Sequence, residues 1–580
     1  MASRKSAIRN PQSTIHNPQS RRPLFIFAAA ALSLMALLCC LAWGVMQVTE
    51  RQKQATATPE AAAAADPRQA TLRVAISPEK AVLFAELAEA FNAQKLRTPD
   101  RRTMQVQAEA QDVETMLQAA LAGKVEAISP DSSLWLDDLD RAWAEQTGSA
   151  APLVGESCRY AVSPIVLAMW EPVARQLGWP ERPIGWGDVQ AQAQRDPNFK
   201  WSHPSTSSAS GLLATLAEFY AGAGKTRGLT IEDAQAQPTL DYVAAVERTV
   251  RYYGEGELAV IERAQKEGPG FLDAFVVQEQ LIVRFNRQAQ GLPRLVAVYP
   301  AEGTLWADHP LALLETPTLT ANQRRTFQHF REFLSSPEAQ AKVLAHGYRP
   351  ADLTIPLDGP ASPLTAANGV DPRQPQTTLQ MPGPAVVEVV RNVWWYTKRH
   401  TNVYLVVDTS GSMTGEKLEA AREALRAFLA QIQGDLERVG LVEFSSQVNN
   451  IIPLDELGRN RAELEQAVEA LEAGGNTALL DAVRAAYVRL QQANDSERIN
   501  AIVAMTDGRE NASLISLQQL AREIEQGNRT GVPVVIFCIA YGRDADYNVL
   551  EAIANASGGQ VRQGDLESIR ELYKILSTYF

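Results

Sequence analysis

The chain has 580 residues, of which 46% are hydrophobic and 21% charged, with a net charge of −12. This length exceeds one typical domain and the composition is that of globular proteins, so two or three folded domains are expected. Seven Lys or Arg against one Glu in the first 54 residues leave a net charge of −18 for the remainder. An acidic body argues against nucleic acid as the main partner, because phosphate binding needs basic patches.

An uncharged, apolar segment over residues 24–46 is the first predicted element in chain order. It is long enough to span a bilayer, and five Arg or Lys residues precede it. The positive-inside tendency therefore places residues 1–23 in the cytoplasm and the bulk of the chain outside. We expect a disordered cytoplasmic tail over 1–23, a transmembrane signal anchor over 24–46 and a stalk over 47–69. A cleaved signal peptide is the alternative, although its apolar core is usually shorter.

Residues 70–352 alternate between strand-like and helix-like segments, which predicts a mixed α/β domain. Serine-rich loops precede several of the predicted helices. Free N–H groups and the helix dipole make such helix N-termini favourable for anions. The candidate ligand contacts are Ser77, Ser132, Ser207 and Ser210. Each of these serines could instead cap a helix. His203 lies near the same loops, and we expect a structural role for it.

Several of these segments resemble bacterial extracellular solute-binding proteins, of the type that includes molybdate- and sulfate-binding proteins. The resemblance rests on Ser77 and on the segments 129–133, 163–167, 205–211, 299–304 and 347–350. It implies two lobes joined by hinge strands that close on an oxyanion or another small solute. Transport receptors usually end after this unit, whereas here the chain continues. The cleft could therefore have become a scaffold, because a fold does not carry function by itself.

Residues 353–385 contain repeated Pro with Gly, Thr and Gln, which is the composition of a linker. The segment 386–400 leads from this linker into the last predicted domain, 386–580. It includes Trp394 and Trp395, which we expect to pack against that last domain rather than form a ligand platform.

The last domain alternates strands and helices, with strand candidates over 403–407, 439–444, 499–505 and 532–540. This order predicts a parallel sheet with right-handed crossovers, in which ligands bind outside the carboxyl ends of the strands. Three loops near such ends carry two carboxylates and three hydroxyls. The candidate metal ligands are Asp408, Ser410, Ser412, Thr477 and Asp507. These are hard oxygen ligands, which suit Mg²⁺ or Mn²⁺ better than zinc or copper, with Ca²⁺ also possible.

The same five residues resemble the metal-ion-dependent adhesion site of von Willebrand factor A domains. Asp408, Ser410 and Ser412 match the D-x-S-x-S pattern, and Thr477 and Asp507 match the two separate ligands. The resemblance implies a doubly wound, Rossmann-like parallel sheet. It also implies that the ion leaves a coordination position open for an acidic residue of a protein partner. Serines in such a pattern are otherwise ordinary helix caps.

Two hypotheses follow for the function. The first is a single-pass plasma-membrane protein whose extracytoplasmic part binds a protein partner through a divalent cation, while the 70–352 unit senses a ligand or acts as a scaffold. The second is a membrane-tethered transport receptor for an oxyanion or another small solute. We do not expect an enzyme, because the sequence contains no convincing nucleophile–base pair and no zinc-ligand spacing among its six histidines.

Overall fold

The computed structural model describes residues 68–580, with gaps at 255, 433, 543, 567, 570–571 and 574–580. The described residues belong to one structural unit, which begins at Pro67. The predicted tail and transmembrane segment lie outside the described residues, as does nearly all of the predicted stalk. In the described part of the chain, no helix is both long enough and apolar enough to cross a membrane.

The first of three sheets has the strand order β2-β1-β3-β10-β4. The strands are β1 (Gln69–Ile76), β2 (Thr103–Ala110), β3 (Ala127–Ser129), β4 (Val154–Arg159) and β10 (Pro310–Leu314). Only β10 runs antiparallel to its neighbours. One face of the sheet packs against α2 (Ala81–Ala93), α12 (Ala321–Leu334) and α13 (Pro337–Ala345). The other face packs against α3 (Val113–Leu121) and α4 (Leu134–Thr147), so apolar side chains cover both faces.

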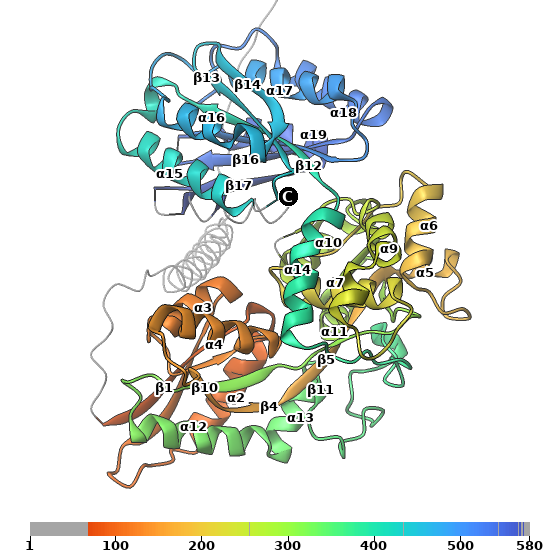
Figure 1. Cartoon of the computed structure of the whole chain (residues 1–580), viewed down its shortest axis with the longest axis vertical. Helices are drawn as coiled ribbons and strands as arrows, with labels where there is room; N and C mark the ends of the chain where they lie inside the picture. Colours follow the sequence, from red (N-terminus) through yellow and green to blue (C-terminus); the bar gives the residue numbers. More distant parts are fainter. Residues whose placement is uncertain are drawn as a thin grey trace, which may run out of the picture. The chain divides into compact units, whose positions relative to one another are not determined.

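The second sheet is built around the long strand β5 (Ala161–Trp170), which is buried along almost its whole length. The other strands are β6 (Trp201–Ser202), β7 (Ala274–Gln278), β8 (Leu295–Val298), β9 (Trp306–Ala307) and β11 (Arg349–Pro350). The surrounding helices are α5 (Glu171–Gln176), α6 (Trp186–Arg195), α7 (Ala209–Gly222), α8 (Ile231–Gln235), α9 (Gln237–Glu247), α10 (Glu257–Glu267) and α11 (Glu279–Gln288). Of these helices, α5, α7 and α11 contact β5, and Figure 1 shows α11 beside it.

The chain passes between the first two sheets at several points. It leaves β4 and enters β5 across Tyr160, and it returns between β9 and β10 through residues 308–309. It crosses again after α13 to form β11, which pairs with β5. The structure therefore has two lobes joined by crossing segments, which confirms the predicted periplasmic-binding-protein-like fold.

The segment predicted as a linker lies against the second lobe. Leu364, Val370 and Leu379 are buried in its core. The backbone N–H of Ala297 donates to Gly369 O at 2.7 Å, and Thr304 exchanges backbone hydrogen bonds with residues 377 and 379. Proline-rich composition indicated a chain without helix or strand, but it could not indicate that apolar side chains at wide spacing would hold this chain in place.

Helix α14 (Pro384–Thr397) follows this segment and packs against α7, α8 and α9 of the second lobe. The ring of Trp394 lies 5.2 Å from that of Tyr253, so Trp394 packs against the first domain rather than the last. The prediction was wrong for this residue, because its indole N–H finds a buried acceptor in Glu247 at 2.5 Å. The ring of Trp395 lies 5.2 Å from that of Trp394 and also approaches the last domain, because a Cβ atom added at Gly434 would lie 3.5 Å from it.

The third sheet has six strands in the order β14-β13-β12-β15-β16-β17. They are β12 (Thr401–Asp408), β13 (Arg438–Phe444), β14 (Val448–Glu456), β15 (Ile499–Thr506), β16 (Val534–Tyr541) and β17 (Gln560–Gly564). All pairings are parallel except that of the edge strand β14. The helices are α15 (Glu416–Gln431), α16 (Leu457–Glu469), α17 (Leu479–Ala493), α18 (Leu517–Thr530) and α19 (Tyr547–Ser557).

Alternation along β12 explains how the helices are divided between the two faces of the third sheet. Val403, Leu405 and Val407 pack with α15 and α16, whereas Tyr404 and Val406 pack with α17, α18 and α19. The connections from β12 and β15 run to opposite sides of the sheet, so these adjacent strands form the topological switch point. The structure thus confirms the predicted parallel, doubly wound sheet.

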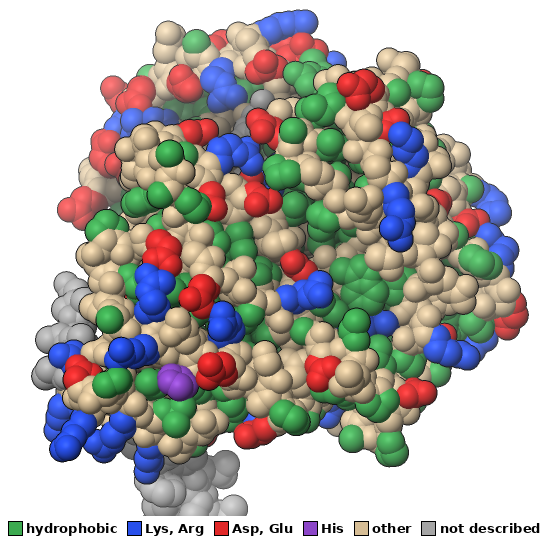
Figure 2. Space-filling model, turned by 60° about the horizontal axis from the view of Figure 1, so that its bottom comes forward, with side chains coloured by type: hydrophobic (Ala, Val, Ile, Leu, Met, Phe, Trp, Pro, Cys, Tyr) green, Lys and Arg blue, Asp and Glu red, His purple; other side chains and the backbone are tan. Residues whose placement is uncertain are grey.

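Charged side chains are spread over the surface. On the face shown in Figure 2, acidic and basic side chains are interspersed among apolar and uncharged ones. Many charged groups in the structure form ion pairs, such as Arg331 with Glu156 at 2.8 Å and Arg141 with Asp138 at 2.6 Å. The net charge of −12 is therefore not gathered into one acidic area on this face.

Candidate functional site

Three loops meet at the carboxyl edge of the third sheet, at its switch point. β12 ends at Asp408, β15 ends just before Asp507, and the loop 474–478 leads into α17. Backbone hydrogen bonds join two of these loops: Gly474 N donates to Thr409 O at 2.8 Å, and Gly411 N donates to Gly475 O at 3.0 Å. The topology of the sheet therefore brings together segments that lie about 100 residues apart in sequence.

The carboxylate of Asp408 is fully buried and held by two donors. Ser410 N donates to its Oδ1 at 2.7 Å, and the Thr506 hydroxyl donates to its Oδ2. Burial raises the pKa of Asp408, the two donors oppose this shift, and Asp507 adds to it. The second carboxylate, Asp507, is also fully buried, and its Oδ1 accepts from Ser412 Oγ at 2.6 Å. Both carboxylates thus face the same small region.

The three hydroxyls converge on that region. Ser410 Oγ and Ser412 Oγ are 3.0 Å apart. A Cβ atom on Gly508 would lie 3.0 Å from Thr477 Oγ1 and 3.3 Å from Ser412 Oγ, so both hydroxyls lie above this glycine. Within the described residues, Thr477 Oγ1 has no hydrogen-bond partner, although Thr477 is only 3% exposed. We call Asp408, Ser410, Ser412, Thr477 and Asp507 the rim site, and the structure brings all five together.

The donor set of the rim site fits a hard divalent cation. It consists only of carboxylate and hydroxyl oxygens, the ligands that Mg²⁺ and Ca²⁺ prefer. Thr506, which supports Asp408, was not predicted, although its position directly before Asp507 offered a hint.

Lys417, at the start of α15, was not predicted either. The Lys417 ammonium forms an ion pair with Asp507 Oδ2, and its side chain is 32% exposed. No motif indicated this contact, because it depends on how α15 begins after the loop at Gly415.

The four serines predicted to contact a ligand fall into two groups. Ser77, Ser132 and Ser210 are buried, whereas Ser207 is exposed and lies 2.6 Å from Ser205 Oγ. Ser132 Oγ accepts from Leu134 N at 3.3 Å, although the N-cap of α4 is the next residue, Ser133. The cap of α7 is Ser208, which accepts from Gly211 N, rather than either predicted neighbour. The hydroxyls of Ser77 and Ser210 are buried without a hydrogen-bond partner.

A cluster of ionisable and amide side chains lies between the two lobes. We call it the cleft cluster, and it consists of Glu79, Lys80, Asp131, Glu257, Gln278 and His309. Lys80 Nζ lies 3.1 Å from Asp131 Oδ1, and Gln278 Nε2 donates to Asp131 at 3.0 Å and to Glu257 at 2.8 Å. Asp131 follows β3 of the first lobe, whereas Gln278 ends β7 of the second. These contacts therefore connect the two lobes across the cleft.

The cleft cluster contains more acidic than basic groups. Oxygens of Glu79, Asp131 and Glu257 lie within 4.8 Å of one another. Burial, with Asp131 next in importance, raises the pKa of Glu79 well above its ordinary value and raises the pKa of Glu257 to about 7. Although burial opposes its ionisation, Lys80 and His309 hold the pKa of Asp131 below its usual range. No motif predicted this cluster, because Lys80 and Glu257 are far apart in sequence.

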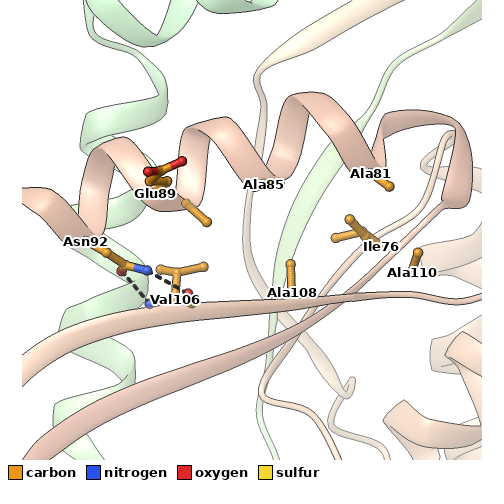
Figure 3. Close-up of a pocket in the computed structure, with 9 residues that line it drawn as sticks. Ile76, Ala81, Ala85, Glu89, Asn92, Val106, Ala108 and Ala110 are labelled. Carbon is orange, nitrogen blue, oxygen red and sulfur yellow. Dashed lines mark hydrogen bonds between the residues drawn. The ribbon is translucent and has the colours of Figure 1, made fainter. Parts of the chain in front are cut away.

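A groove between α2 and the edge strand β2 has different chemistry. It encloses about 560 Å³ and is lined largely by small apolar side chains, including Ala81, Ala85 and Ala108. Figure 3 shows the amide of Asn92 hydrogen-bonded to the backbone of Val106, at 2.8 and 3.0 Å. The groove thus offers little free polar chemistry for a specific ligand.

Comparison with protein families agrees with this architecture. Residues 402–574 match the von Willebrand factor type A domain, and residues 72–349 match the bacterial extracellular solute-binding proteins. The chain therefore contains one domain of each family, which confirms both resemblances found in the sequence. Together the two domains support an extracellular binding or adhesion role.

Individual relatives match one domain at a time. The chain is 31% identical over 170 residues to the inter-alpha-trypsin inhibitor heavy chain H4 of Sus scrofa; this match covers 28% of the chain and 18% of the relative. The chain thus spans about a fifth of the length of such relatives. The sulfate-binding protein SubI of Mycobacterium tuberculosis H37Rv has 18% identity and a TM-score of 0.36, over 49% of this chain and 88% of that one. A von Willebrand factor type A protein of Catenulispora acidiphila has 24% identity and a TM-score of 0.28, over 31% and 43%.

Proposed function

We propose that the protein is a membrane-anchored, extracytoplasmic binding protein that recognises a protein partner through a divalent cation at the rim site. In this proposal the five rim residues hold Mg²⁺, and an acidic side chain of the partner completes its coordination. The convergence of five oxygen donors from three loops carries the proposal. The role is binding rather than catalysis, because the groups at the rim form no nucleophile–base pair.

Calorimetric titration of the full chain with Mg²⁺, Mn²⁺ and Ca²⁺ tests the cation. We expect Asp408→Ala to abolish binding and Thr477→Val to weaken it at least tenfold, about 1.4 kcal/mol. Thr477→Val is the sharper variant, because it keeps the side-chain shape and removes a hydroxyl that has no protein partner. Thr414→Val is the matched control, since Thr414 lies in the loop that carries Ser410 and Ser412, and its hydroxyl donates to Gly411 O at 2.8 Å. Unchanged binding by Thr477→Val would contradict the proposal.

The partner is tested by capture with the full chain as bait, in Mg²⁺ and in EDTA. A partner that uses the ion is expected on the wild-type bait in Mg²⁺, and to be lost both in EDTA and with Thr477→Val. Proteins captured equally under all three conditions do not use the rim site. If every captured protein behaves in this way, the adhesion part of the proposal is wrong even where the cation binds.

The second candidate function is the binding of a small solute in the cleft. The charge of the cleft cluster indicates which kind of solute would bind there. An oxyanion placed there would face Glu79, Asp131 and Glu257, with Lys80 already paired to Asp131. These carboxylates favour a small cationic solute over the oxyanion that the serine loops suggested. Thermal unfolding with putrescine, sulfate or molybdate added separates the two. Stabilisation by putrescine that Glu257→Gln removes supports a cationic ligand, whereas stabilisation by sulfate or molybdate supports an oxyanion receptor.

We also propose a location in the plasma membrane, with residues 1–23 in the cytoplasm. The uncharged segment 24–46 and the basic residues before it support this orientation. Fractionation of cells that express the full chain, followed by protease treatment from outside, tests it. The two domains are expected in the membrane fraction and open to external protease; recovery in the cytosolic fraction would contradict the proposal.

A further inference from the structure

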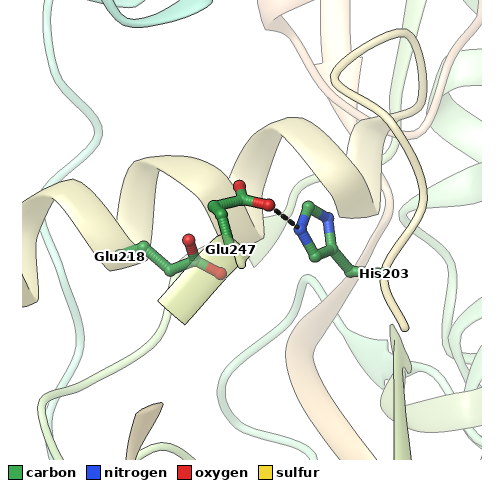
Figure 4. Close-up of side chains that lie close together, drawn as sticks. All are labelled: His203, Glu218 and Glu247. Atoms are coloured by element: carbon green, nitrogen blue, oxygen red, sulfur yellow. Dashed lines mark hydrogen bonds and ion pairs between the residues drawn. The ribbon is translucent and has the colours of Figure 1, made fainter. Parts of the chain in front are cut away.

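Three ionisable side chains meet in the core of the second lobe, apart from both the rim site and the cleft cluster. His203 follows β6, Glu218 lies in the middle of α7, and Glu247 is the last residue of α9. Each is at most 1% exposed, and their ligand atoms lie within 4.8 Å of one another. Figure 4 shows the imidazole and both carboxylates directed toward one small region. We call these three residues the core triad.

The hydrogen bonds of His203 fix which ring nitrogen can bind a cation. Nδ1 lies 2.8 Å from Pro204 O, and a carbonyl only accepts, so Nδ1 carries a proton. In the neutral imidazole, Nε2 then presents its lone pair to the triad, 3.1 Å from Glu247 Oε2. A histidine that donates one N–H to a backbone carbonyl while its other nitrogen faces carboxylates has the usual arrangement of a metal ligand.

Glu218 is the member of the triad that protein groups leave unsatisfied. Both of its carboxylate oxygens are buried without a hydrogen-bond partner. Among the described residues, no Lys or Arg forms an ion pair with it, although fully buried glutamates are almost always paired. Burial, reinforced by Glu247 and Glu302, raises the pKa of Glu218 well above its ordinary value. A lone buried carboxylate is costly, so a cation or a proton has to accompany it.

Glu247 is held in position from outside the triad. The Tyr253 hydroxyl donates to its Oε2 at 2.7 Å, and Trp394 Nε1 donates to its Oε1 at 2.5 Å. Supporting donors of this kind orient carboxylate ligands in metal sites. One carboxylate is therefore fixed by hydrogen bonds, while the other is free to complete a coordination shell.

We propose that His203 Nε2, Glu218 and Glu247 bind one divalent transition-metal ion of the Zn²⁺ type. A neutral imidazole and two carboxylates balance the charge of a dication, whereas without metal the triad needs two added protons to reach neutrality. Nitrogen and carboxylate ligands at about 2.0–2.2 Å suit zinc. To reach these distances the ligand atoms have to move closer together, and Glu218 can make this movement because no hydrogen bond holds its carboxylate in place. If one carboxylate binds the ion through both oxygens, it supplies the fourth ligand atom.

The site is enclosed by protein, so the ion is structural and is acquired during folding. Because Trp394 donates to Glu247 from α14, the bound ion also fixes the helix that leads into the last domain. The proposal is independent of the rim site, whose oxygen ligands suit a different class of cation.

The test is metal analysis of the full chain, made without a histidine tag in zinc-containing medium and dialysed against chelating resin. We expect about one zinc per chain in the wild type and in Asp408→Ala, and less than about 0.2 in Glu218→Gln. Glu302→Gln is the matched control, because it removes a nearby carboxylate outside the triad and is expected to keep the metal. A wild type without a transition metal, or zinc retained by Glu218→Gln, would overturn the proposal.

A second measurement covers the case in which Glu218→Gln fails to fold. X-ray absorption at the zinc edge of the wild type is expected to show nitrogen and oxygen neighbours only, and no sulfur. Chelator added in the Asp408→Ala background, which lacks the rim cation, is expected to lower the thermal unfolding midpoint. Sulfur neighbours, or an unfolding midpoint that does not change after the metal is removed, would contradict a structural ion at the triad.

Discussion

Two lysine–aspartate pairs, one in each domain, look alike but differ in exposure. In the cleft cluster, Lys80 Nζ lies 3.1 Å from Asp131, and the side chains are 1% and 5% exposed. At the rim site, Lys417 pairs with the fully buried Asp507, but its own side chain is 32% exposed. Lys80 also donates to Pro130 O at 2.7 Å, so its ammonium is held from more than one side.

The difference indicates which pair can give way to a ligand. If Lys80 moved away from Asp131, a buried ammonium and a buried carboxylate would both lose their ion-pair partner, which costs several kcal/mol. Lys417 can turn toward water and leave Asp507 to a metal ion at small cost, because exposed ion pairs are weak. The first pair therefore stays closed within the first lobe, and the second lies at a site that a cation can enter.

The largest expected effect is on stability. Lys80→Met leaves the buried Asp131 without its lysine partner, and should lower the free energy of unfolding by about 3–5 kcal/mol. Lys417→Met should change it by less than about 0.5 kcal/mol. Tryptophan fluorescence in urea measures the first effect selectively, because the sequence has no Trp after Trp395. Circular dichroism follows the last domain. Equal losses of unfolding free energy in the two variants would contradict the proposed difference between the two ion pairs.

The next effect is the pH dependence of stability that Glu257 of the cleft cluster contributes. Burial and Asp131 raise the pKa of Glu257 to about 7, so the folded state binds a proton that the unfolded state has released. Stability from this group is complete below the unfolded pKa of about 4.5 and is lost as pH rises through 7. The loss between pH 5 and pH 8 should be of the order of 3 kcal/mol, and should be absent in Glu257→Gln. The measurement is urea unfolding followed by fluorescence, and the same slope in both proteins would refute the assignment.

A smaller effect is expected on cation affinity at the rim site. The charge of Lys417 competes with the cation for Asp507. Lys417→Met removes this charge and should therefore tighten Mg²⁺ binding about five- to tenfold, or about 1 kcal/mol. Lys417→Arg keeps the charge and is the control. Calorimetry at low and at moderate salt measures both. Weaker binding by Lys417→Met would mean that the lysine supports the site instead of competing for it.

The smallest effect concerns the space above Gly508. A methyl group there would lie 3.0 Å from Thr477 Oγ1, tight enough to displace this hydroxyl by a few tenths of an ångström. Gly508→Ala should therefore weaken Mg²⁺ binding a few-fold, without measurable change in stability. Gly474→Ala, where a Cβ meets nothing within 4 Å, should bind as the wild type does. If both variants bind equally, the space above Gly508 is not where the ion lies.

The fold and the rim residues could be predicted because local signals determine them. Apolar strand segments followed by helical spacing specify a parallel sheet, and the D-x-S-x-S pattern lies directly at a strand end. Lys417 and Thr506 were missed because their roles depend on side-chain directions, which spacing does not give. Whether the rim residues bind a metal stays a prediction.

The cleft cluster and the core triad could not be predicted, for two physical reasons. Their members come from segments up to 230 residues apart, and burial rather than residue type makes them chemically unusual. The serine loops suggested an anion because helix N-termini were visible in the sequence, whereas the opposing Glu257 of the second lobe was not. Adjacent serines such as Ser207, Ser208 and Ser210 are also indistinguishable until the backbone shows which one begins the helix.

The central position of β12 has a consequence for tension. The strand starts three residues after α14 and ends at Asp408, and it is hydrogen-bonded in parallel to β13 on one side and β15 on the other. In optical-tweezer experiments, a pull applied at Thr409 is expected to meet a higher rupture force than one applied at Asn450 of the edge strand β14; equal forces would contradict this. A partner that pulls on the rim loop loads the hydrogen bonds of β12 with β13 and those with β15 in shear at the same time. The strand that presents the site therefore also bears the force.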